Sequence, residues 1–161
     1  MRAAVANPNR VAAYLVTTGA PTAVATAQYF WGSAQQVGLT VGGVLLNQEA
    51  DTEAISANFA PLAISSLPIC PAADWQPLID ALPDLRQVSG LPKPIEIDIP
   101  ARQVRLFLPG FDKKQVKLTQ YGPEVTIEAG DQRRNISLPP QLSGQPVKGA
   151  KFQNSYLAIS F

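Results

Sequence analysis

The sequence predicts two regions of different fold class, an α/β region over residues 1–91 and an all-β region over residues 92–161. The first alternates short apolar runs with helical patterns, whereas the second contains short β-branched runs separated by Pro and Gly. The first carries three basic and six acidic residues, a net charge of −3, whereas the second carries ten and six, a net charge of +4. Between them, Pro92 and Pro94 follow Ser89 and Gly90, a composition typical of a stiff, extended linker.

Three β-α units are expected in the first region. The order strand, helix, strand, helix, strand, helix favours an open parallel sheet with right-handed crossovers. The continuous apolar run Thr40–Asn47 is typical of a strand buried on both faces of such a sheet. The other predicted strands are residues 14–18 and 62–67, and the predicted helices are residues 21–37, a short one ending near Phe59, and one capped by Asp74 and stopped by Pro83.

The helix over residues 21–37 should bury one stripe of side chains. Pro21 suits the first helical turn, and Gly38 stands where a left-handed C-terminal cap belongs. The apolar side chains recur at helical spacing. The stripe consists of Val24, Ala27, Trp31, Ala34 and Val37.

The second region alternates apolar and polar residues with period two, which predicts about seven short strands in a β-sandwich. Turns are expected at residues 121–123 and 130–132, where Gly and its neighbours interrupt the pattern. The alternating apolar groups are Val104-Leu106-Leu108, Val116-Leu118, Val125-Ile127, Ile136-Leu138 and Leu157-Ile159-Phe161.

Composition excludes several classes of function. The chain has no His, which excludes His-based triads, His metal sites and His pH switches. The single Cys70 excludes an intramolecular disulfide and a cysteine-only zinc site, and with no base partner it is expected to be inert. The net charge of +1 gives no sign of the basic surface that is typical of nucleic-acid binding. No apolar run reaches the roughly 20 residues that span a bilayer, so we expect a soluble protein of the cytoplasm or plastid stroma.

The short motifs of the chain do not by themselves identify a functional site. Gly42-Gly43 is not followed by the Gly-Lys-Ser/Thr of a Walker loop, so these glycines are expected to let a helix pack closely on the strand. Lys113-Lys114 and Arg133-Arg134 are expected to be solvated turn charges, and the aspartates of the second region lack metal-ligand spacing. Asn47 ends a buried strand, where it is either a turn residue or an amide facing a purine in the ligand crevice.

The stretches Tyr14-Leu-Val-Thr-Thr-Gly-Ala-Pro and Gly38-Leu-Thr-Val-Gly-Gly-Val-Leu-Leu-Asn-Gln48 resemble the C-terminal part of the arsenical pump-driving ATPases. These are deviant-Walker P-loop NTPases, related to the ATPases that guide tail-anchored membrane proteins. The resemblance implies a partial P-loop NTPase sheet in which the Asn47 amide and the loop at Pro68 contact adenine. It also implies that the intact protein binds ATP and Mg²⁺ and forms a homodimer.

The second region resembles the α-crystallin domain of small heat-shock proteins. The resemblance rests on Leu108-Pro-Gly-Phe-Asp-Lys-Lys-Gln-Val-Lys-Leu, on Val125-Thr-Ile-Glu-Ala-Gly, and on Ala150-Lys-Phe-Gln-Asn-Ser-Tyr-Leu157. Ser155 replaces the glycine of the last signature, which removes a residue that adopts positive φ at little cost. Only residues 130–132 separate two adjacent strands, so the loop strand that bacterial-type members exchange between partners has no room.

Both resemblances together imply the cyanobacterial and plastid type of this ATPase, with a crystallin-like domain at its C-terminus. We therefore expect the C-terminal portion of an ATP-hydrolysing pump or targeting ATPase, inactive alone because it has no phosphate loop or switch Asp. A non-enzymatic, chaperone-like binding module is the alternative, and a purely structural appendage is a third. Expected partners are hydrophobic client segments or the rest of the ATPase, and neither a nucleic acid nor a membrane. No catalytic or metal-binding residue is predicted.

Overall fold

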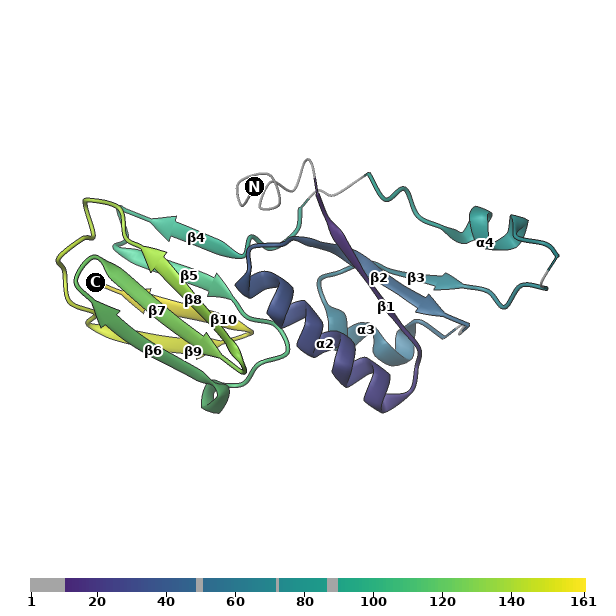
Figure 1. Cartoon of the computed structure of the whole chain (residues 1–161), viewed down its shortest axis with the longest axis horizontal. Coiled ribbons are helices and arrows are strands. Elements are labelled where there is room, and N and C mark those ends of the chain that lie inside the picture. Colours follow the sequence, from purple (N-terminus) through teal and green to yellow (C-terminus); the bar gives the residue numbers. More distant parts are fainter. Residues whose placement is uncertain (1–10, 49–50, 72, 87–89) are drawn as a thin grey trace. The chain divides into compact units, whose positions relative to one another are not determined.

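Figure 1 shows a computed structural model of the chain. The structure describes residues 11–48, 51–71, 73–86 and 90–161. Ser89 of the predicted linker lies outside these residues. Within them, no helix is long and apolar enough to cross a membrane.

The chain divides into two compact units. The first comprises Met1–Trp31 and Leu39–Pro92. The second comprises Gly32–Gly38 and Lys93–Phe161.

In the first unit, three parallel strands lie in the order β1-β2-β3, so β2 is central (Figure 1). The order of strands and helices agrees with the sequence prediction, with ends shifted by at most two residues. The elements are β1 (Ala13–Thr17), α2 (Pro21–Gln36), β2 (Val41–Asn47), α3 (Glu53–Phe59), β3 (Ile64–Leu67) and α4 (Gln76–Ala81).

The core of this unit forms between the sheet and its two longer helices. Trp31 of α2 and Phe59 of α3 lie side by side, with ring centroids 6.2 Å apart, and both are buried. Gln28 Nε2 also donates to the Asn58 carbonyl across the two helices. On the strands, the buried apolar side chains are Leu15, Val41, Val44, Leu45, Leu46 and Leu67.

The prediction that Val37 belongs to the buried stripe of α2 was wrong. Val37 is 66% exposed, whereas Gln35 and Gln36 are buried. The reason is that α2 ends at Gln36, and Gly38 then takes the left-handed conformation (φ 79°), so Val37 leaves the helical stripe.

The Gly pair in β2 makes room for a side chain rather than for a crossing helix. A Cβ at Gly42 would lie 2.9 Å from the ring of Tyr14, which belongs to the neighbouring strand β1. At Gly43 it would lie 3.1 Å from both that ring and the Ala63 carbonyl oxygen. The glycines therefore let Tyr14 lie flat against its own sheet.

The second unit contains two antiparallel sheets, β4-β5-β10-β9 and β6-β7-β8. This gives seven strands, as the period-two pattern predicted, and one short 3-10 helix. The elements are β4 (Ile95–Asp98), β5 (Gln103–Phe107), η1 (Lys113–Gln115), β6 (Val116–Tyr121), β7 (Glu124–Ala129), β8 (Gln132–Ser137), β9 (Gly149–Gln153) and β10 (Tyr156–Ser160).

Apolar side chains from both sheets make the core of the sandwich. Most of them belong to the alternating pattern, because successive side chains of a strand point to opposite faces. Fully buried members are Val104, Leu106, Leu108, Val125, Ile127, Ala129 and Ile159, with Leu142 contributed by the connection between β8 and β9.

Tight turns join most neighbouring strands. Gly122 and Gly130, both at positive φ, stand at the β6–β7 and β7–β8 turns as predicted. The β7–β8 turn has only two residues, so no extra strand lies there. Asn154 and Ser155 have φ of 51° and 60°, which makes the β9–β10 connection a two-residue turn despite the missing glycine.

Candidate functional site

The two predicted adenine contacts lie on neighbouring strand ends. Asn47, the last residue of β2, is the direct partner of Leu67, the last residue of β3. Pro68 follows Leu67, and the Gln48 N–H donates to the Leu67 carbonyl at 2.9 Å. The parallel pairing therefore brings Asn47 and Pro68 together at the carboxyl end of the sheet, where open α/β sheets bind ligands.

The chemistry of this corner suits a neutral ligand group. The Asn47 side chain is half-buried and offers one carbonyl and one amide, the complement of a purine edge. Cys70 lies close by, with its thiol 3.7 Å from the Pro68 carbonyl oxygen. These groups are neutral, so they supply no positive charge for phosphates.

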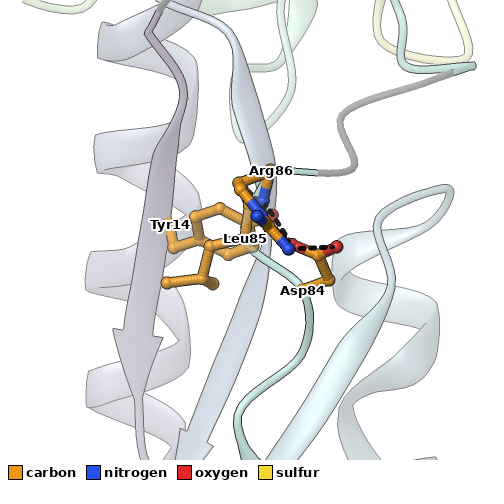
Figure 2. A network of polar contacts seen from close by, with 4 residues as sticks. All are labelled: Tyr14, Asp84, Leu85 and Arg86. Carbon is orange, nitrogen blue, oxygen red and sulfur yellow. Dashed lines mark hydrogen bonds and ion pairs between the residues drawn. The ribbon is translucent and has the colours of Figure 1, made fainter.

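The basic side chain among the first unit's described residues lies at the end of the sheet opposite Asn47. Among its described residues, Arg86 is the one basic side chain, and its Nε lies 3.0 Å from Asp84 Oδ1. Figure 2 shows this pair beside Tyr14, whose hydroxyl donates to the Leu85 carbonyl at 3.4 Å. Tyr14 is near the start of β1, whereas Asn47 ends the parallel strand β2. Arg86 is therefore not placed to hold a phosphate near Asn47.

A second candidate site runs along β4 in the second unit. An open groove of about 580 Å³ follows this strand, from Lys93 to Pro100, with Arg105 on the adjacent strand β5. Two apolar side chains are unusually accessible there, since Ile97 is 42% and Ile99 is 41% exposed. Accessible aliphatic side chains in a groove are suited to binding another polypeptide.

Polar and aromatic groups border this groove. Arg105 Nη1 lies 3.6 Å from Glu96 Oε2, and its guanidinium carbon lies 4.7 Å from the centre of the Tyr156 ring. Burial, and then the charge of Glu96, raise the pKa of Tyr156, while Arg105 opposes the shift. The Tyr156 ring also packs on Phe107, with ring centroids 4.9 Å apart. These contacts hold Arg105 over the outer face of the sheet.

Sequence reasoning did not identify the β4 groove, because it assigned Pro92 and Pro94 to a linker and began the alternating pattern at Val104. The signal was present as Ile95-Glu-Ile-Asp-Ile99, which alternates strictly. Of the paired basic residues, Lys113 and Lys114 are exposed on η1, as expected. Arg134, in contrast, is half-buried within β8, where burial lowers its pKa.

The comparison with known protein families concerns the second unit. A two-sheet antiparallel sandwich with these turns is consistent with the HSP20-like class of domain. Residues 101–161 match the family model described as the HSP20-like domain found in ArsA. The match spans β5 to β10 and leaves β4 outside it. No curated protein matches the chain.

Proposed function

We propose that the second unit is a chaperone-like domain that binds other polypeptides without catalysis, as part of an ArsA-type protein. The observation that carries this proposal is the match of residues 101–161 to the HSP20-like domain found in ArsA. The exposed isoleucines of the β4 groove support it, because a polypeptide-binding surface needs accessible apolar side chains.

An aggregation assay tests this proposal. When insulin is reduced, its B chain aggregates and light scattering rises. The full chain should slow this rise, and added ATP and Mg²⁺ should not change the effect. Serum albumin at the same mass concentration is the control for crowding. If insulin aggregates equally fast at equimolar and higher ratios of the chain to insulin, the result contradicts the proposal.

We propose that the first unit is the C-terminal part of an ATPase domain, in which Asn47 and the loop at Pro68 contact adenine. The parallel order β1-β2-β3 and the direct pairing of Asn47 with Leu67 support it. ATP, Mg²⁺ and a homodimeric state belong to the intact ATPase under this proposal. The chain alone should then bind nucleotide weakly and hydrolyse none, because most affinity in P-loop proteins comes from phosphate contacts.

The expected affinity is low. Hydrogen bonding between the Asn47 amide and adenine contributes about 1 kcal/mol to binding. This is far less than the roughly 8 kcal/mol that micromolar binding requires. NMR titration with adenosine at millimolar concentration should shift the signals of Asn47 and its neighbours. Asn47→Ala should remove these shifts, whereas Asn58→Ala, on helix α3 of the same unit, should keep them.

Two outcomes would contradict the proposal for the first unit. Micromolar ATP binding by this chain would reveal phosphate contacts that the proposal lacks. Adenosine shifts that survive Asn47→Ala would show that Asn47 does not contact adenine.

A further inference from the structure

Helix α4 and the residues at its two ends expose a stripe of apolar side chains. Trp75, Ile79 and Leu82, called the α4 stripe below, are 63%, 58% and 40% exposed. Their spacing of four and then three residues places them on one face of the helix. Within the described residues, α4 packs chiefly against β3 and buries no side chain of its own (Figure 1). Large exposed apolar side chains that gather in this way indicate a surface that another molecule covers.

The α4 stripe is not the face that attaches the helix to its own unit. Leu78 and Ala81 lie on a neighbouring face and are half-buried, so they make the contact with the rest of the first unit. A third face is polar, where Gln76 Nε2 donates to Asp80 Oδ1 at 2.7 Å. A partner could therefore cover the stripe without displacing α4 from its unit.

The α4 stripe has an acidic border. Asp74 and Asp80 are exposed, and each adjoins a residue of the stripe in the sequence. Their printed partners are neutral, because Asp74 accepts from the Gln76 backbone N–H and Asp80 from the Gln76 amide. Only Asp84 has a cation beside it, since its Oδ1 lies 3.0 Å from Arg86 Nε. Two carboxylates beside the stripe are therefore not balanced by positive charge among the described residues.

The charge of the first unit as a whole points the same way. Its described residues contain one guanidinium, that of Arg86, and five carboxylates. A membrane surface with anionic lipids would be repelled by this charge. Two-fold pairing of α4 with α4 of a second copy would bring the same carboxylates together. Lys or Arg next to apolar side chains would instead complement the α4 stripe and its border.

We propose that the α4 stripe binds an amphipathic helix of another protein, in which Lys or Arg borders the apolar face. Side chains at this spacing form a ridge that fits between the side chains of a second helix. Helix α4 has six residues and is about 9 Å long, so the contact is small and the binding weak and reversible. This inference goes beyond both proposed functions, because it uses neither Asn47 nor the second unit.

Peptide titration of the full chain tests the charge preference. The probes are two labelled amphipathic helical peptides of equal length, with Leu on the apolar face and either Lys or Glu on the polar face. Fluorescence anisotropy should show tighter binding of the Lys peptide. Asp74→Asn combined with Asp80→Asn should weaken that binding about two- to ten-fold, the range expected for two exposed ion pairs. Glu53→Gln, an exposed carboxylate on α3 of the same unit, is the matched control and should leave it unchanged.

Tryptophan fluorescence tests the apolar contact. The chain has two tryptophans, and Trp31 is buried, so the Lys peptide should move only the emission of Trp75 to shorter wavelength. Trp75→Phe should abolish this shift. Trp75→Ser combined with Ile79→Ser should weaken binding about ten-fold or more, because aromatic anchors dominate such contacts. Val37→Ser, at an apolar position that is 66% exposed, is the matched control.

The emission shift of the native chain keeps the test decisive even where the serine variant loses α4. Equal affinity for the two peptides, or binding of the Lys peptide without a shift of Trp75 emission, would overturn the inference. The same shift with vesicles that contain phosphatidylglycerol would identify a membrane as the occupant and would contradict it. Self-association of the chain that Trp75→Ser abolishes would identify a second copy, with the same consequence.

Discussion

At the scale of single residues, Ser155 holds a backbone conformation that favours glycine. Its φ is 60°, and that of Asn154 is 51°, in the two-residue turn between β9 and β10. Asn tolerates this left-handed region better than most residues, whereas Ser gains little there. The turn forms because both flanking strands pair along their whole length, from Gly149 with Ser160 to Gln153 with Tyr156.

Ser155→Gly should stabilise the chain by about 0.5–1 kcal/mol, because glycine adopts positive φ without a Cβ clash but loses more entropy on folding. Urea denaturation followed by circular dichroism measures this change. Ser137→Gly is the matched control, and it should destabilise because Ser137 lies in strand β8. Equal effects of the two substitutions would contradict the assignment of strain to Ser155.

At the scale of elements, one side chain ties the long connection between β8 and β9 to strand β6. Gln120 Nε2 donates to the Gln145 carbonyl at 2.7 Å, and Gln120 Oε1 accepts from the Val147 N–H at 2.8 Å. Both bonds are part-buried, so each contributes to the stability of the connection. Gln120 therefore substitutes for the ladder hydrogen bonds that this irregular segment lacks.

Gln120→Ala should lower the free energy of unfolding by about 1–3 kcal/mol, the net contribution of two hydrogen bonds. Lys117→Ala, an exposed position on the same strand, should change it by less than about 0.5 kcal/mol. Hydrogen exchange at the Val147 amide should accelerate only in the Gln120 variant. Slow exchange at Val147 in Gln120→Ala would refute the role of the side chain.

At the scale of the whole molecule, the described part of the first unit has an apolar sheet edge. Among the described strands, β1 ends its sheet, and a groove of about 550 Å³ lies between β1 and α2. Val16 and Phe30 line this groove and are 63% and 58% exposed. A parallel sheet normally has neighbours on both sides, and an exposed apolar edge promotes association.

The purified chain should therefore self-associate or unfold at modest temperature. Val16→Thr combined with Phe30→Ser should shift sedimentation velocity profiles toward the monomer, because it removes apolar area from the groove. Ile69→Thr is the control, since Ile69 is 73% exposed but does not line the groove. A monodisperse wild-type monomer with a high melting temperature would contradict this prediction.

Much of the secondary structure follows from the sequence alone. The alternation through Val125 and Ile127 defines β7, because only period two places both side chains on one face. Gly122 and Gly130 mark the turns on either side of it, because they adopt positive φ cheaply. The apolar run ending at Asn47 likewise defines the central strand β2 and places Asn47 at its carboxyl end.

The tertiary structure decided what each element packs against. Local pattern does not reveal that Tyr14 lies on Gly42 and Gly43, because this contact depends on the register of two strands far apart in sequence. The same holds for Gln35, which is buried although it lies outside the apolar stripe predicted for its helix. The groove along β4 depends on strand order, since among the described residues this alternating strand lies at the end of its sheet. Sequence thus determined the strands and turns, through local backbone sterics, whereas edges and grooves arose from the pairing of distant segments.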